Sequence, residues 1–186
     1  MTLPFMQKFP KAIPGIGGKE TYFIEKIYTS IGDTVRSIVV PRCDMKIPYK
    51  IRVVEPKELV ECIEKDLVYS GKFHRKYHTI RKGNRFKKGD KIHMVINNRT
   101  KNRFQFAPVL EVKSVQKIFM TDYNNLEITI SKRDPFFYYL YYKDKEQLAL
   151  NDGFESYKDF EAFFLHAMKK EHEFSGQIIH WTDLRY

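Results

Sequence analysis

Short β-type runs separated by turns dominate the chain after Gly71, and this feature limits the folds that it can adopt. Strands are predicted at 76–81, 91–97, 104–119, 126–132 and 135–142. In one of these runs, polar side chains alternate with the apolar Leu126, Ile128 and Ile130, which is typical of a half-buried antiparallel strand. Because helices do not alternate with these runs, a parallel nucleotide-binding sheet is disfavoured.

Helices are predicted before and after this β-rich part. Apolar residues recur at helical spacing from Thr21 until Gly32 and Asp33, and a second helix is expected at 56–69. Ser156 and Asp159 resemble a capping pair at the start of a third helix, 156–170. Brief strands are predicted at 37–40, 51–54 and 177–182.

The chain is long enough for one domain with a hydrophobic core, because 42% of its 186 residues are hydrophobic. Prolines and glycines in the first part favour an extended arm over any regular element at 1–20. We expect a helical and irregular elaboration at 21–70 and a β-rich body at 71–186. The expected fold is α+β, a small β-barrel or strongly curved sheet with peripheral helices.

Cysteine usage and hydropathy indicate a compartment. Cys43 and Cys62 have no CxxC neighbour, so neither a disulfide scaffold nor a cysteine zinc site is expected. The sequence has no standard secretion signal and no run of about eighteen apolar residues. We therefore expect a cytoplasmic protein that does not span a membrane; the oligomeric state is left open.

The most unusual segment is 71–89, which carries eight cations and no acid, within a chain whose formal net charge is +10. These cations are Lys72, Arg75, Lys76, Arg81, Lys82, Arg85, Lys87 and Lys88. Tyr77 and Phe86 lie among them, and Arg99 and Lys101 continue the basic character. Cations beside aromatic rings suit a phosphate backbone with unstacked bases, so RNA or a nucleotide is the expected partner. The alternative is a solvated basic face.

The pattern K-x-x-T-I-R at 76–81, followed by a basic turn ending in Gly89 and Asp90, resembles the ASCH domain of the PUA-like barrel superfamily. Further blocks that look like this family are Ala-Leu-Asn-Asp-Gly-Phe at 149–154, the aromatic helix behind it, and Ile-Ile-His-Trp at 178–181. The blocks stand in the family's order from Gly71 to the end. The resemblance implies a PUA-like β-barrel.

Known members of the wider family include RNA-binding modules, an acetylcytidine amidohydrolase and proteins with ribonuclease activity. In the amidohydrolase a lysine acts as base, a threonine as nucleophile, and a glutamate supports them. By resemblance these roles fall on Lys76, Thr79 and Asp152, with Lys72 as an alternative lysine. No cofactor is implied.

We therefore expect a basic cleft between the 76–81 strand and the 151–154 turn. It is predicted to accept a nucleotide or single-stranded RNA, with Arg81, Arg99 and Lys101 near phosphate and Tyr77 and Asn151 also contacting the ligand. The nucleic-acid surface is expected to comprise Lys72, Arg75, Lys82, Arg85, Phe86, Lys87 and Lys88. Alternative functions are hydrolysis of acylated cytidine-type nucleosides or RNA, and a protein-interaction module.

Each candidate also has a structural interpretation. Thr79 and Arg81 fit a strand threonine and a surface arginine bonded to a carboxylate, and Asp152 fits a turn stabiliser. His78, His93 and His180 are expected to be packed or surface histidines rather than metal ligands, and no metal site is predicted. The aromatic run 136–142 is interpreted as a central strand covered on both faces.

Overall fold

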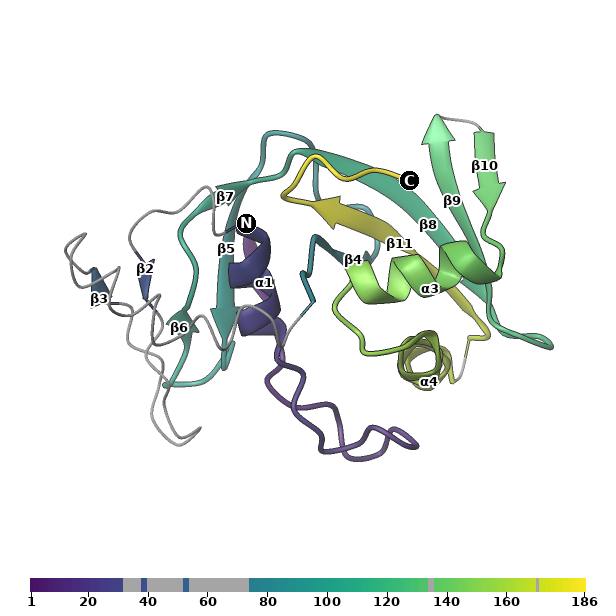
Figure 1. Cartoon of the computed structure of the whole chain (residues 1–186), viewed down its shortest axis with the longest axis horizontal. Coiled ribbons are helices and arrows are strands. Elements are labelled where there is room, and N and C mark those ends of the chain that lie inside the picture. Colours follow the sequence, from purple (N-terminus) through teal and green to yellow (C-terminus); the bar gives the residue numbers. More distant parts are fainter. Residues whose placement is uncertain (32–37, 40–51, 54–73, 134–135, 170) are drawn as a thin grey trace.

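A five-stranded antiparallel sheet carries most of the second half of the chain. Its strands are, in order across the sheet, β10 (Phe136–Tyr139), β9 (Glu127–Arg133), β8 (Ser114–Thr121), β11 (Glu173–His180) and β4 (His78–Lys82). The computed structural model describes residues 1–31, 38–39, 52–53, 74–133, 136–169 and 171–186. In this order β10 and β4 form opposite edges of the sheet. Figure 1 shows β9 and β10 at the right-hand end of the molecule.

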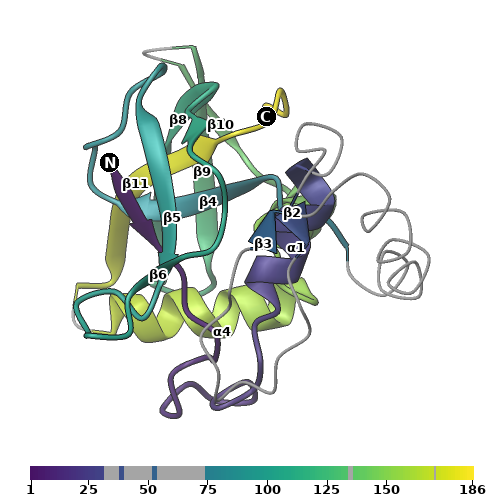
Figure 2. The same cartoon turned by 90° about the vertical axis from the view of Figure 1, so that its left-hand side faces the viewer.

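A second sheet is built around β5 (Lys91–Ile96) and includes the N-terminal arm. β1 (Thr2–Pro4) pairs with β5 in parallel, whereas β6 (Phe104–Gln105) and β7 (Leu110–Glu111) pair with it antiparallel. The expectation of an arm without regular structure is therefore wrong at its start. The start of the chain runs beside β5 (Figure 2). Leu3 and Phe5 are buried, and this burial holds the arm against the body.

The remaining strands partly match the sequence patterns. β2 (Ile38–Val39) and β3 (Arg52–Val53) form an antiparallel pair, as the two short β-branched runs predicted. The predicted run 104–119 is divided among β6, β7 and β8, because Pro108 and the turns around it interrupt the strand. The predicted helix at 56–69 lies outside the described residues.

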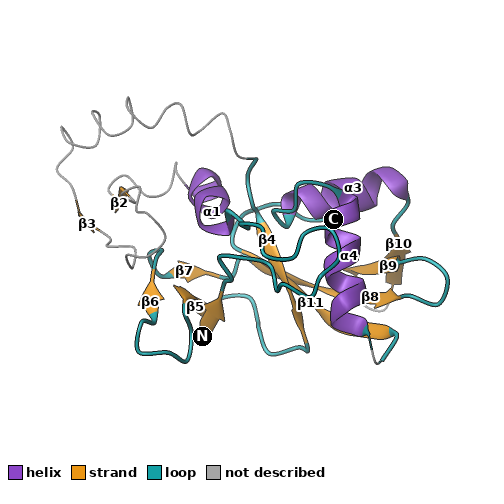
Figure 3. Ribbon diagram, turned by 90° about the horizontal axis from the view of Figure 1, so that it is seen from below, coloured by secondary structure: helices purple, strands orange, loops and turns teal. Residues whose placement is uncertain are grey.

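Three described helices surround the sheets. α1 (Phe23–Ile31) and α4 (Tyr157–Met168) confirm two predicted helices, and the Ser156 hydroxyl accepts the Asp159 N–H at 3.2 Å as the capping pair predicted. α3 (Tyr142–Asn151) was not predicted, because it begins within the aromatic run that was interpreted as a strand. Figure 3 shows α3 and α4 together over the strands.

Aromatic packing joins these layers. Phe154 lies between Phe160 of α4, with ring centroids 5.3 Å apart, and Phe23 of α1, at 5.9 Å. Phe164 of α4 meets Phe174 of β11 at 5.3 Å. These edge-to-face contacts fix the segment after α3 between the N-terminal helix and the five-stranded sheet.

The architecture is α+β, as expected, but the described strands form no closed barrel. They divide between the two larger sheets and the β2–β3 pair. Within the described part of the chain, no helix is long and apolar enough to cross a membrane.

Candidate functional site

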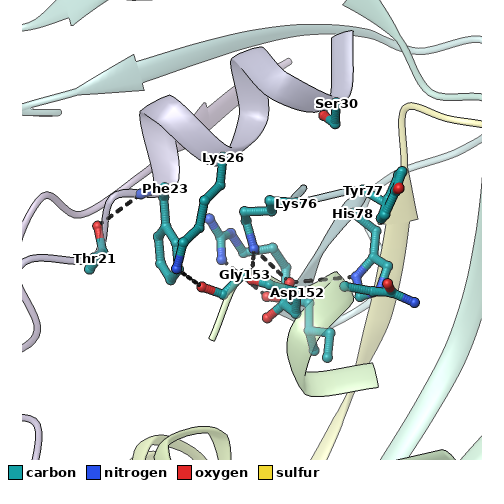
Figure 4. A network of polar contacts seen from close by, with 12 residues as sticks. Thr21, Phe23, Lys26, Ser30, Lys76, Tyr77, His78, Asp152 and Gly153 are labelled. Atoms are coloured by element: carbon teal, nitrogen blue, oxygen red, sulfur yellow. Dashed lines mark hydrogen bonds and ion pairs between the residues drawn. The ribbon is translucent and has the colours of Figure 1, made fainter. Parts of the chain in front are cut away.

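An internal ion pair joins the segment before β4 to the end of α3. The Lys76 ammonium lies 2.8 Å from Asp152 Oδ1 and also donates to the Asp152 carbonyl, and the Lys76 residue is only 1% exposed. Figure 4 shows both side chains meeting inside the molecule. Two residues 76 positions apart in sequence are thus brought together.

The end of α3 sets the position of Asp152. Gly153 has a φ of +88°, its N–H donates to Leu150, and the Phe154 N–H donates to Ala149. This is the Schellman pattern that ends a helix, and it needs a residue without a side chain at the left-handed position. Asp152 is the C-cap of α3, so its carboxylate is presented where the helix ends.

Lys26 of α1 is a second buried lysine that the sequence interpretation missed. Its ammonium donates to the Gly153 carbonyl at 2.7 Å and pairs with Glu155 Oε1 at 2.5 Å. The Lys26 carbonyl also accepts the Lys76 N–H at 2.9 Å. Its helical spacing could have revealed it, since Lys26 lies three residues after Phe23 and beside Ile27 on the apolar face.

Burial changes the ionisation of the site. It lowers the pKa of Lys76 from 10.5 to about 8, although the charge of Asp152 acts in the opposite direction. Burial alone would raise the pKa of Asp152, but the charges and hydrogen bonding of Lys76 and His78 outweigh it and leave that pKa below its ordinary value. Burial also lowers the pKa of Lys26, which Glu155 partly opposes.

Thr79 and Arg81 border the same interior space as the ion pair. A cavity of about 20 Å³ is lined by Lys76, Thr79, Ile80, Arg81 and Asp152, with Met6 and aromatic side chains from α1, α4 and the 154 turn. Lys76 precedes β4, so the alternation of strand faces does not separate it from Thr79. Thr79 is itself only 1% exposed, so its hydroxyl is shielded from bulk solvent.

The Arg81 guanidinium crosses from β4 to the N-terminal arm. It donates to the Pro4 carbonyl at 2.6 Å and to the Ile80 carbonyl at 3.1 Å, and it lies 5.2 Å from the Phe5 ring centroid. It therefore binds carbonyls and an aromatic face rather than the carboxylate of the structural interpretation. These contacts hold the N-terminal arm beside the cavity, which Met6 of the arm lines.

A row of buried polar side chains lies beside the ion pair. His180 of β11 is directly opposite Ser114 of β8 and His78 of β4. His78 Nδ1 is 3.5 Å from Asp152 Oδ1, and its Nε2 is 2.6 Å from the Tyr186 hydroxyl. Burial lowers the pKa of His180 to about 3, so this ring is neutral, and both of its nitrogens lack a partner among the described residues.

The predicted nucleic-acid residues lie largely in the turn after β4. Lys82, Arg85, Lys87 and Lys88 are exposed, as is Arg75. Phe86 is instead a core residue, only 3% exposed, and its N–H and carbonyl are held by the Gln177 side-chain amide. Its ring is therefore not presented for base stacking.

The other predicted ligand residues are not among those that line the cavity. Arg99 and Lys101 are exposed in the β5–β6 connection, away from the lining. The Asn151 amide is bonded to Gln147 and to the Tyr186 hydroxyl, and its carbonyl accepts the Tyr77 N–H at 2.9 Å. Lys72 lies outside the described residues. Asn151 thus holds neighbouring segments together.

No group of three or more histidine, cysteine, aspartate or glutamate side chains suited to a metal ion occurs in the described part of the chain. Comparisons with protein-family models, with curated proteins and with solved structures find no match to this chain.

Proposed function

We propose that this protein is an ASCH-like, PUA-like module that binds a nucleotide or a single-stranded RNA segment along β4. The observation that carries the proposal is the continuity of two features on this strand. Thr79 and Arg81 border the cavity that holds the Lys76–Asp152 pair, and Lys82 begins the exposed basic turn directly afterwards. Lys82 points to the face opposite Thr79 and Arg81, but the rest of the turn begins two residues after Arg81, about 7 Å along the chain, which is within the reach of one short ligand.

The two parts of this surface suit different parts of a nucleotide. Exposed cations of the turn bind phosphate without reading sequence, whereas the enclosed polar groups select a base or its substituent. The cavity volume of about 20 Å³ fits a water molecule rather than a base. Ligand entry therefore requires lining side chains to move, and Met6 and Phe163 are half-buried members of the lining.

Fluorescence anisotropy with labelled single-stranded RNA and with mononucleotides tests this proposal. Removing Arg85, Lys87 and Lys88 together by alanine substitution should weaken RNA binding strongly and reduce its salt dependence, by roughly 0.7 in log-log slope per lost phosphate contact. The matched control removes the same charge at the exposed Lys11, Lys113 and Lys158. Equal losses in both triple variants, or no binding by the wild type, would overturn the proposal.

Hydrolysis of an acylated nucleoside is a second candidate, favoured by Thr79 lining the same cavity as a lysine whose pKa is about 8. In this reaction neutral Lys76 takes the hydroxyl proton as Thr79 Oγ1 attacks the acyl carbon. The C–N bond then breaks, and the Lys76 ammonium returns the proton to the leaving amine. Water subsequently hydrolyses the threonine ester, releasing the acid and restoring the hydroxyl.

Thr79→Val is the cleanest test of this second candidate. Valine keeps the branched shape of threonine, so the variant should fold, and circular dichroism checks that it does. Acetate release from N4-acetylcytidine is expected in the wild type and absent in the variant. Absence of turnover in the wild type would remove the hydrolase candidate while leaving RNA binding to its own experiment.

A further inference from the structure

The aromatic run after β9 is an exposed surface, which overturns its interpretation as a covered central strand. The exposed fractions are 71% for Phe136, 53% for Phe137, 37% for Tyr138, 37% for Tyr139, 66% for Tyr141 and 77% for Tyr142. We call these six side chains the aromatic edge. Within the run only Leu140 turns inward, at 1% exposed.

The aromatic edge is large for a surface without a function. With about 200 Å² for each aromatic side chain, the exposed fractions correspond to about 700 Å² of aromatic surface. Contiguous apolar patches of several hundred Å² mark interaction sites, and a standard interface takes about 800 Å² from each partner. The summed aromatic surface is therefore close to the area that one partner buries in a standard interface.

The backbone adds a second feature to the aromatic edge. β10 is the terminal strand of the five-stranded sheet and pairs only with β9 among the described strands. Its outer edge thus offers unpaired N–H and C=O groups, which are a template for another strand. Tyr138 and Tyr139 also point to opposite faces, because neighbouring residues alternate across a strand.

We propose that β10 pairs antiparallel with β10 of a second copy of this chain, forming a two-fold symmetric dimer through the aromatic edge. Antiparallel pairing of identical strands places the same surface on both sides of the axis, which is the condition for a closed dimer. Cross-strand aromatic pairs then cover one another, and aromatic pairs stabilise neighbouring antiparallel strands.

The charge distribution permits this association. Near the aromatic edge, the exposed Lys132 and Lys143 are accompanied by Asp144 and Glu146. The basic turn follows β4 at the opposite edge of the sheet, four strand spacings or about 19 Å away. This exceeds the Debye length of about 8 Å at physiological salt, so the basic turns do not oppose the dimer.

The placement of aromatic side chains on opposite faces of β10 also favours a second copy of the chain over a nucleic acid as the partner of this edge. A base-stacking platform gathers its rings on one face and tracks the phosphates with cations. Here the neighbouring Tyr138 and Tyr139 lie on opposite faces of β10, and Lys132 is held over the Tyr138 ring at 4.2 Å. In the dimer, β4 and its basic turn lie at the outer ends of the two sheets. The dimer proposal is therefore independent of the proposed function.

Sedimentation velocity of the full chain tests the dimer over a range of concentrations. The wild type should convert from monomer to dimer as concentration rises, with little dependence on salt. Phe136→Thr combined with Phe137→Thr should weaken association at least about tenfold, because the most exposed part of β10 is removed. Tyr123→Ser is the matched control: Tyr123 is 69% exposed but lies between β8 and β9.

Circular dichroism and thermal unfolding show whether the variants fold. Should the double variant fail to fold, Tyr142→Ser replaces it, because this side chain is 77% exposed at the start of α3. A wild type that stays monomeric, or variants that dimerise as well as the Tyr123 control, overturns the proposal. A monomer whose RNA binding is lost in the β10 variants overturns it in favour of base stacking.

Discussion

The Lys76 ammonium lies 2.8 Å from the Asp152 carboxylate in an interior where both residues are almost fully buried. Two charges cost free energy to remove from water, and each compensates the other only while both are present. The contribution of Lys76 to stability therefore depends on Asp152, and that of Asp152 depends on Lys76.

This dependence is measurable as a coupling free energy. Lys76→Met alone leaves a buried carboxylate without its cation and should lower the free energy of unfolding by about 3–5 kcal/mol. Combining Lys76→Met with Asp152→Asn should be less destabilising than the sum of the two single effects. Urea unfolding of the four proteins provides the measurement, and additive effects would show that the pair contributes no coupling.

Stability should depend on pH through Lys76. Its pKa falls from 10.5 to about 8 on folding, so between these values the unfolded chain binds more protons than the folded one. The free energy of unfolding contributed by this group should rise with pH across that window, by up to about 3 kcal/mol. Subtracting the pH profile of Lys76→Met isolates this contribution. A difference that falls with pH would contradict the assignment.

Gly153 should tolerate no side chain. At its φ of +88°, an added Cβ would lie 3.0 Å from Lys76 Cδ and 3.2 Å from Phe23. Left-handed backbone costs an alanine about 1–2 kcal/mol, and crowding of the lysine adds to that. Gly83→Ala is the matched control, because Gly83 has a φ of +85° with nothing within 4 Å of the added atom. Equal losses of stability in both variants would show that the Lys76 side chain moves aside at no cost in free energy.

The Tyr186 hydroxyl should contribute to stability through two buried partners. It lies 2.6 Å from His78 Nε2 and accepts from Asn151 Nδ2 at 2.9 Å. Tyr186→Phe leaves both groups unsatisfied and should cost about 1–3 kcal/mol in thermal or urea unfolding. Tyr123→Phe, at an exposed hydroxyl bonded to Glu173, should have little effect. The same small effect at Tyr186 would mean that water replaces its hydroxyl.

Local patterns predicted much of the fold because their physical causes are local. The apolar spacing of α1, the capping pair of α4 and the alternation in β9 each act within a few residues of one another. The parallel β1–β5 pair has no such local cause, since it joins residues about ninety positions apart. The start of α3 was missed because Tyr141 and Tyr142 continue an aromatic pattern typical of strands.

Part of the candidate site could be marked from the sequence by residue type. Lys76, Thr79 and Asp152, which the sequence marked as candidates, all line one cavity, and their chemistry is a proposal. Burial could not be deduced so easily: Phe86 stands among exposed cations yet packs in the core, whereas the aromatic edge packs against little. Hydrophobicity alone does not distinguish these cases, because edge position is set by the whole sheet.

Nuclear magnetic resonance of the ¹⁵N-labelled full chain, titrated with a short single-stranded RNA, tests the central proposal most directly. RNA binding along β4 should change amide shifts in β4, in the basic turn that follows it, and at Asp152 and Gly153. Changes confined to β10 and α3, or no saturable change in any assigned amide, would contradict it.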